Sequence, residues 1–269
     1  MLKKRIFTSL AGIALLLVVI WFGSNWFTFL VGLAAIIAGF EFYNLIYPKK
    51  SSPLISLGLA LAFLLATGPA IKEKTLYLGI LSILLIPFLV INIAENIKNR
   101  VLVHEEWVFV FAVIISGFFL SYYTSLININ QGRSWTILAI FTTFAADSGA
   151  YFIGSNWGKT ALAPKISPHK TWEGALGGLG CAIGAGFILS YILLGLTKDV
   201  LWSIMPGLLI GIFSPMGDLA VSFFKRRAGV KDSGNLLPGH GGILDRIDSL
   251  LVSGIVIYYY ANFVINLSL

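Results

Sequence analysis

The chain has 269 residues, of which 57% are hydrophobic and 12% are charged, and its mean hydropathy is +0.88. Soluble domains contain roughly 25% charged residues, so this composition excludes a soluble globular protein. The net charge of +7 is divided among short segments between apolar runs, a distribution that predicts a membrane protein with no nucleic-acid partner.

Apolar stretches of about 18 to 25 residues recur along the whole chain, the length that crosses a hydrocarbon core roughly 30 Å thick. The first could instead be a signal peptide, but no small-residue cleavage site with a polar exit follows it. We therefore predict an all-α fold, a polytopic integral membrane bundle of about nine transmembrane helices. In chain order, the predicted helices are at residues 6–23, 26–47, 53–70, 75–96, 107–129, 135–156, 173–196, 202–224 and 245–267.

The Lys and Arg residues predict which side of the membrane each connecting segment occupies. If the N-terminus is cytoplasmic, all 19 of them face the cytoplasm except Lys72, Lys74, Arg133 and Lys198. One missed or added helix would invert part of this distribution. It therefore supports nine helices, with the N-terminus inside and the C-terminus outside.

The two parts of the chain differ in chemistry. Residues 1–130 are expected to form an N-terminal scaffold, because the ionisable residues within their predicted helices are Glu41 and Glu95, near helix ends. Residues 131–269 carry acidic residues inside apolar helices and two long cytoplasmic loops, at residues 157–172 and 225–244. We therefore expect residues 131–269 to form the catalytic region.

Asp147 and Asp218 lie inside predicted helices, where a carboxylate is costly and normally faces a partner, an ion or a water-filled cavity. The alternative is a carboxylate that is hydrogen-bonded to a neighbouring helix or held neutral. Ser222 and Lys225 follow Asp218 at spacings of four and three residues, so these three share one helical face. This face predicts a polar stripe that runs from the membrane interior to the cytoplasmic surface.

The last predicted helix begins with Asp245, Arg246 and Asp248, and the three-residue spacing places the two carboxylates on one face. Either carboxylate alone could cap the helix or complement its dipole. Converging carboxylates without a comparable basic partner in the membrane instead predict a divalent cation, and hard oxygen ligands favour Mg2+ over zinc. The predicted metal ligands are Asp147, Asp218, Asp245 and Asp248, and the presence of a second ion stays open.

The two cytoplasmic loops carry residues suited to phosphate. Residues 225–235 hold four cations beside glycine, although the orientation of a membrane protein would also explain cations there. Glycines around His240 suggest a turn that closes on a ligand, while a single His is more often a solvated loop residue. Residues around Pro168 can bind phosphate, base or ribose, and Thr171 can instead cap the helix that follows. Neither loop has the pattern of a P-loop.

These segments resemble the phosphatidate cytidylyltransferase (CDP-diacylglycerol synthase) family. A second conserved segment of that family is similar to residues 167–174, whereas the N-terminal half matches in character only. The long signature of the family is matched by Ser222, Lys225, Arg226, Lys231, Asp232, Gly234, Leu237, Pro238, His240, Gly241, Gly242, Asp245, Arg246 and Asp248.

The resemblance implies a nucleotidyltransferase that transfers CMP from CTP to phosphatidic acid, giving CDP-diacylglycerol and pyrophosphate in phospholipid biosynthesis. It also implies dependence on a divalent metal and a homodimer in the cell (inner or plasma) membrane, with the active site facing the cytoplasm. We expect catalytic roles for Lys225, Arg226, Lys231, Asp245 and Asp248. Substrate binding is expected at Lys159, Ser167, Pro168, His169, Lys170, Thr171, Ser222, Asp232, His240, Gly241, Gly242 and Arg246.

Two other functions use similar parts. A CTP-dependent lipid kinase would transfer the terminal phosphoryl group to a polyprenol or a similar alcohol. An ion-coupled transporter would also place carboxylates inside the membrane, but it should distribute them through a central pathway. In this chain the charged residues are concentrated at one end of the helices, which favours the cytidylyltransferase.

Overall fold

The computed structural model describes residues 2–46, 53–99, 110, 112–195, 200–236 and 241–267, which are mostly helical. The chain divides into two compact units. The first comprises residues Met1–Ser125 and Asp232–Asp245, and the second comprises residues Leu126–Lys231 and Arg246–Leu269.

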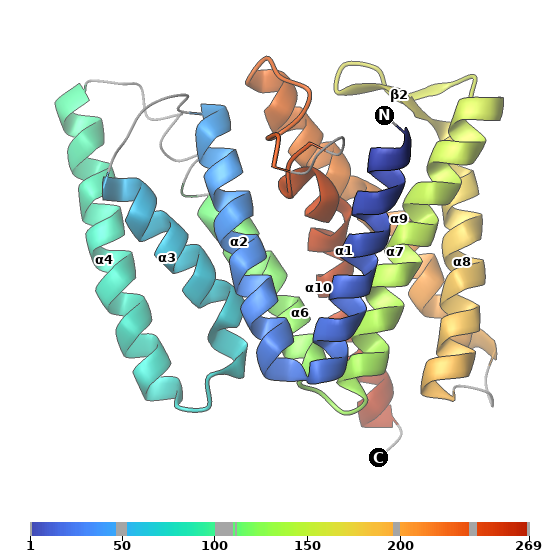
Figure 1. Ribbon diagram of the computed structural model, residues 1–269, viewed down its shortest axis with the longest axis horizontal. Coiled ribbons are helices and arrows are strands. Elements are labelled where there is room, and N and C mark those ends of the chain that lie inside the picture. Colours follow the sequence, from blue (N-terminus) through green and yellow to red (C-terminus); the bar gives the residue numbers. More distant parts are fainter. Residues whose placement is uncertain are drawn as a thin grey trace. The chain divides into compact units, whose positions relative to one another are not determined.

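The first unit is a set of apolar helices from the N-terminal part of the chain. Its elements are α1 (Leu2–Phe22), α2 (Ser24–Ile46), α3 (Pro53–Thr67), η1 (Gly68–Ala70), α4 (Lys74–Asn99), η2 (Ile115–Phe119) and α6 (Leu120–Ile127). Helix α3 packs against α2, α4 and the π-helical turn η2, while α1 packs against α2 (Figure 1). Gly117 brings η2 against the backbone of α3, because a Cβ atom there would lie 2.8 Å from the carbonyl oxygen of Ala62.

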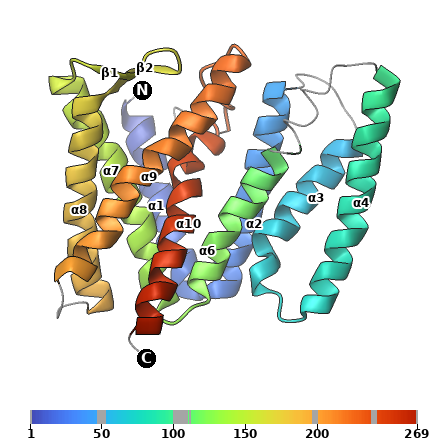
Figure 2. The ribbon, with the colours of Figure 1, turned by 180° about the vertical axis from the view of Figure 1, so that it is seen from behind.

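The second unit contains α7 (Gly132–Trp157), α8 (Trp172–Leu194), α9 (Val200–Arg227) and all but the first two residues of α10 (Leu244–Leu267). Helix α8 packs against both α7 and α9, which lie beside it in Figures 1 and 2. Glycines make these contacts close: a Cβ atom at Gly178 would lie 2.7 Å from the Ala146 carbonyl oxygen on α7. Small residues at such contacts are typical of helices that pack in lipid.

A short hairpin connects α7 to α8. Its strands β1 (Ala161–Ala163) and β2 (Ser167–Thr171) pair antiparallel, with Ala161 opposite Thr171. Strand β2 contacts both helices, and the hairpin lies at their ends in Figure 1. The structure thus adds a two-stranded sheet to the predicted helical architecture.

Five of the described helices are long and apolar enough to cross a membrane: α2, α7, α8, α9 and α10. Their bounds follow the predicted spans closely, since α7 covers Gly132–Trp157 where residues 135–156 are predicted. Shorter apolar helices occupy the described parts of the other four predicted spans, at Thr8–Phe22, Ile55–Ala70, Lys74–Val90 and Ala112–Ile127. The apolar helix bundle is confirmed, whereas the count of nine spans and their orientation stay predictions.

Candidate active site

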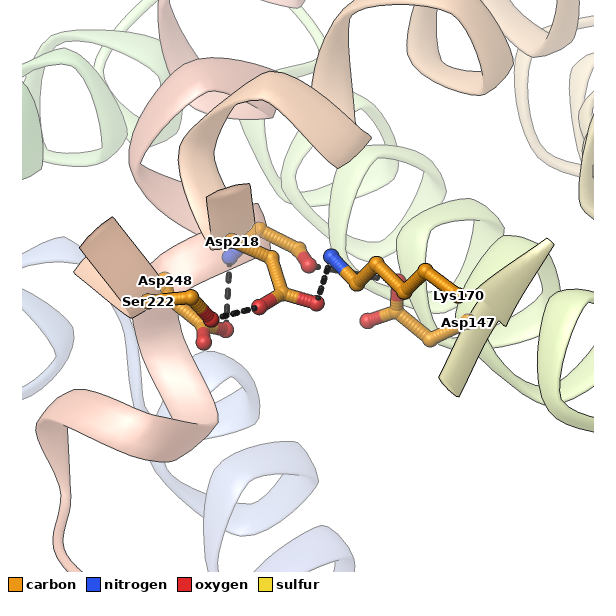
Figure 3. A network of polar contacts seen from close by, with 6 residues as sticks. Asp147, Lys170, Asp218, Ser222 and Asp248 are labelled. Atoms are coloured by element: carbon orange, nitrogen blue, oxygen red, sulfur yellow. Dashed lines mark hydrogen bonds and ion pairs between the residues drawn. The ribbon is translucent and has the colours of Figure 1, made fainter. Parts of the chain in front are cut away.

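Three carboxylates of the second unit form a cluster, which we call the carboxylate cluster: Asp147 on α7, Asp218 on α9 and Asp248 on α10. Figure 3 shows Asp218 between Asp248 on one side and Asp147 on the other. Each helix contributes one carboxylate, so helix packing brings together acids that are far apart in the sequence. The structure therefore brings together three of the four predicted metal ligands.

Asp218 contacts two polar side chains, those of Lys170 and Ser222. The Nζ atom of Lys170, on β2, lies 2.5 Å from one of its carboxylate oxygens (Figure 3). The hydroxyl of Ser222, one turn further along α9, donates a 3.0 Å hydrogen bond to the other oxygen. Asp218 and Ser222 thus lie together on one face of α9, as predicted, and Lys170 of the hairpin contacts the same face.

Ser249 joins the other two carboxylates. Its hydroxyl donates a 3.2 Å hydrogen bond to Asp147, and its backbone N–H donates a 2.8 Å hydrogen bond to Asp248. The Ser249 carbonyl accepts from Ser253, whose hydroxyl in turn accepts a 2.8 Å hydrogen bond from Thr143. Hydroxyl groups therefore bridge α7 and α10 next to the carboxylates, and this network satisfies Thr143, Ser249 and Ser253 inside apolar helices.

The charges within this unit are partly balanced. Asp248 is 7% exposed and interacts electrostatically with Asp218, Asp147 and Lys225, a lysine that is itself 7% exposed. Like charges repel strongly where water is excluded, so nearby cations stabilise the cluster when its carboxylates are ionised. Lys170 and Lys225 supply two of them, and the exposed Arg246 adds a weaker attraction to Asp147.

The chemistry of these donors suits a hard cation. Carboxylate and hydroxyl oxygens are the ligands that Mg2+ prefers, and no thiol or imidazole belongs to the described cluster. In the described part of the chain, no three Asp, Glu, His or Cys side chains lie close enough together to enclose a metal ion as placed. The donor types therefore fit Mg2+. One of the three carboxylates, that of Asp218, forms an ion pair with Lys170.

The hairpin is held in place by local hydrogen bonds. The side chain of Thr171 accepts a 3.1 Å hydrogen bond from Gly174 N–H and caps α8, as one of the two sequence interpretations predicts. Glu173 accepts from the backbone N–H groups of Lys159 and Thr160, at 3.1 and 3.2 Å. These contacts fix both ends of the hairpin. The predicted substrate-binding residues Lys159, Pro168 and His169 are exposed on it, and Ser167 is half-buried.

The basic segment after α9 is tied to the same hairpin. Arg226 donates hydrogen bonds from its guanidinium to the carbonyls of Ile166, at 3.0 Å, and Val230, at 3.1 Å. Gly229 has a φ of +73°, which lets the chain reverse so that Val230 N–H donates to Lys225. Among the predicted catalytic cations, Lys225 is buried toward the carboxylates whereas Lys231 is exposed.

The rest of the signature lies in the first unit, in the segment Asp232–Asp245. One carboxylate oxygen of Asp245 accepts hydrogen bonds from the backbone N–H groups of Ser233, at 2.8 Å, and Gly242, at 3.0 Å. Gly241 has a φ of +81°, and a Cβ atom there would lie 2.7 Å from the Asp245 carboxylate. Asp232 is exposed, and His240 lies outside the described residues.

Three acidic or polar residues that contribute to these sites are absent from the predicted set: Glu41, Glu173 and Ser249. Glu173 lies within the segment 167–174, and Ser249 follows Asp248 directly, so their positions beside predicted residues were a usable signal. Glu41 accepts hydrogen bonds from Ile243 and Leu244. The sequence feature that could have pointed to it is the presence of an acidic residue within an apolar helix.

Comparisons with known proteins identify the family of the chain. The sequence matches the cytidylyltransferase family over residues 3–264. It is 34% identical over 253 residues to the phosphatidate cytidylyltransferase of Bacillus subtilis, covering 93% of this chain and 94% of the relative. It is 31% identical over 252 residues to that of Staphylococcus haemolyticus, covering 93% and 95% of the two chains. A shorter match, to that of Haemophilus influenzae, is 43% identical over 139 residues, covering 50% and 48%. The chain therefore belongs to the cytidylyltransferase family.

Proposed function

We infer that this protein is a membrane-embedded nucleotidyltransferase that transfers a cytidylyl group from CTP to phosphatidic acid. The observation that carries this inference is the similarity to phosphatidate cytidylyltransferases along nearly the whole chain. The carboxylates and cations between α7, α9 and α10 supply a site of the right chemistry for polyphosphate. The reaction belongs to phospholipid biosynthesis.

The reaction joins two anions. A phosphate oxygen of phosphatidic acid attacks the α-phosphorus of CTP, the bond from that phosphorus to the β-phosphate oxygen breaks, and pyrophosphate leaves. The phosphate monoester is already an anion at neutral pH, so no strong general base is needed. The main task of the site is to offset charge and hold the two phosphates in line.

The cations of the site are assigned to this task. Lys225, Arg226 and Lys231 stabilise charge on the CTP phosphates and on the departing pyrophosphate. Arg226 also positions the hairpin through its hydrogen bond to Ile166. The remaining predicted residues hold the nucleotide or the lipid phosphate: Lys159, Ser167, Pro168, His169, Lys170, Thr171, Ser222, Asp232, His240, Gly241, Gly242 and Arg246.

The acidic residues are assigned to Mg2+. Asp147, Asp218 and Asp248 hold it, with Asp245 as a further ligand. When bound, Mg2+ neutralises triphosphate charge and polarises the phosphoryl group. Lys170 offsets the charge of Asp218 through their ion pair.

The proposed topology has nine spans, a cytoplasmic N-terminus and an external C-terminus, in the cell membrane. Residues 1–130 are the scaffold and residues 131–269 the catalytic region, and the enzyme is a homodimer, as the family resemblance implies. This arrangement lets CTP enter from the cytoplasm while the acyl chains of phosphatidic acid remain in the lipid.

Cysteine labelling tests the orientation. In a Cys181→Ser background, Ser167→Cys and Asn235→Cys should react only with a reagent applied from the cytoplasmic side, and Lys72→Cys only from outside. Asn235 and Lys72 are exposed, so their accessibility reports the side of the membrane rather than burial. Labelling of Ser167→Cys or Asn235→Cys from the outer face alone would overturn the assignment.

Product identification tests the activity itself. Purified protein given CTP, phosphatidic acid and Mg2+ should form CDP-diacylglycerol and pyrophosphate in equal amounts. A CTP-dependent lipid kinase would release CDP instead, and an ion-coupled transporter would leave CTP unchanged. Either result would refute the proposed function.

A further inference from the structure

Glu41 lies on α2, in the part of the chain expected to be scaffold, yet its side chain contacts the signature segment. It is 6% exposed. Its carboxylate accepts three hydrogen bonds, from the hydroxyl of Ser233 at 2.9 Å and from the backbone N–H groups of Ile243 at 2.9 Å and Leu244 at 2.8 Å. All of these groups belong to the first unit.

The two backbone donors are the N–H groups at the start of α10, which begins at Leu244. The first N–H groups of a helix have no partner within the helix and carry its positive dipole end. A carboxylate from a distant helix therefore caps α10, in the place where a local side chain would usually do so.

The contact is closely packed. A Cβ atom at Gly234 would lie 2.9 Å from one carboxylate oxygen of Glu41, and a Cβ atom at Gly242 would overlap both Glu41 and Ser233. Ser233 is held twice, since its backbone N–H donates to Asp245 while its hydroxyl donates to Glu41. Gly234 and Gly242 thus bring the segment directly against the Glu41 carboxylate.

The charge of Glu41 is stabilised by these three donors, the Ser233 hydroxyl and the two backbone N–H groups. A buried carboxylate with several N–H and O–H donors forms strong, directional contacts. Glutamine cannot replace it fully, because its NH2 group would face one of the backbone N–H donors. The position therefore requires a carboxylate.

We propose that Glu41 is a positioning residue for the cytidylyltransferase reaction. By fixing Ser233 and the start of α10, it holds the described residues 232–236 and 241–245 in the conformation that binds CTP. This proposal rests on the proposed function for its kinetic consequence. Its structural consequence, the protection of the start of α10 by a carboxylate on α2, can be measured without turnover.

The test compares Glu41→Gln with the wild-type enzyme in detergent. We expect the KM for CTP to rise about tenfold, as the loss of one charge-assisted hydrogen bond predicts, while the KM for phosphatidic acid stays within about twofold. Amide hydrogen exchange in the peptide containing Ile243 and Leu244 should accelerate by about tenfold. The matched control, Glu73→Gln, removes an exposed carboxylate from the same unit and should change neither quantity.

A second variant separates positioning from general stability. Ser233→Ala removes one of the three donors, so it should raise the KM for CTP less than Glu41→Gln does. The double variant should fall short of the product of the two effects, because the residues act through one contact. Unchanged CTP KM and unchanged exchange in Glu41→Gln would overturn the proposal. So would a loss of activity that merely follows the loss of folded protein.

The failure of this proposal is distinguishable from the failure of the proposed function. If the wild-type enzyme forms no CDP-diacylglycerol, the proposed function is refuted, and hydrogen exchange in Glu41→Gln still decides whether Glu41 protects the start of α10. If the wild-type enzyme is active and both measurements are unchanged in the variant, only the role of Glu41 is refuted.

Discussion

Replacement of Asp248 by asparagine is expected to lower cytidylyl transfer by at least about a hundredfold while the protein stays folded. Asp248 is 7% exposed and interacts with both other members of the carboxylate cluster. Asparagine keeps the shape of the side chain and its hydrogen bond from Ser249 N–H, but it loses the charge that would hold Mg2+. Turnover of the wild-type and Asp248→Asn enzymes, measured at several Mg2+ concentrations, tests this expectation.

The melting temperature without metal gives an independent reading. Asp248 is repelled by two carboxylates and attracted by one lysine, Lys225, so loss of its charge relieves more repulsion than attraction, and the metal-free Asp248→Asn protein should melt no lower than the wild type. Asp245→Asn is the companion variant, because an asparagine oxygen can still accept the two N–H groups that Asp245 accepts. We expect it to lose turnover as well, since its charge is assigned to Mg2+. Wild-type turnover in both variants would remove the metal site from α10.

Replacement of Lys225 by methionine is expected to lower kcat/KM by roughly tenfold to a thousandfold, the range typical of losing one charge-stabilising donor. Lys225 is 7% exposed and interacts with Asp248, so its charge acts inside the site rather than at the surface. Methionine preserves much of the length of the side chain. The loss should therefore come from the missing charge, both in the phosphate complex and beside the carboxylates.

The control for this variant is Arg227→Ala. Arg227 is an exposed cation in the last turn of the same helix, two residues further along. If cations there serve only to orient the protein in the membrane, the two variants should behave alike. Full activity of the Lys225→Met enzyme would reduce Lys225 to such a topology signal.

The helices could be predicted from the sequence because their signal is local. A run of apolar residues long enough to cross lipid specifies a helix without reference to the rest of the chain. This is why residues 202–224 predict α9, which covers Val200–Arg227. The hairpin had no such signal. Its strands are three and five residues long, and β2 includes Pro168 within a segment that reads as a polar loop.

The acidic members of the site were also predictable, because a carboxylate inside an apolar helix is costly and needs a reason. Their partners from other helices and from the hairpin were not. Lys170 reaches Asp218 from the hairpin, and Ser249 reaches Asp147 across 102 positions of sequence. Glu41 and Leu244 are 203 positions apart. Such pairs depend on how helices pack, which helical periodicity within one segment does not specify.

The spacing of Asp245 and Asp248 illustrates the same limit. Helical periodicity predicts that both carboxylates share a face. In the structure, Asp245 accepts hydrogen bonds from Ser233 and Gly242 at the start of the helix, while Asp248, one turn later, belongs to the carboxylate cluster. A shared face therefore did not mean shared partners, because the chain folds back over the first turn of α10.

The fate of each phosphorus atom of CTP tests the central inference most directly. Purified enzyme is incubated with phosphatidic acid, Mg2+ and CTP labelled at either the α- or the γ-phosphorus, and the lipid and aqueous products are separated. Cytidylyl transfer predicts that the α-label enters the lipid and that the γ-label appears in pyrophosphate. The Asp248→Asn enzyme should form neither labelled product. Entry of the γ-label into the lipid, with the α-label recovered in CDP, would contradict the account.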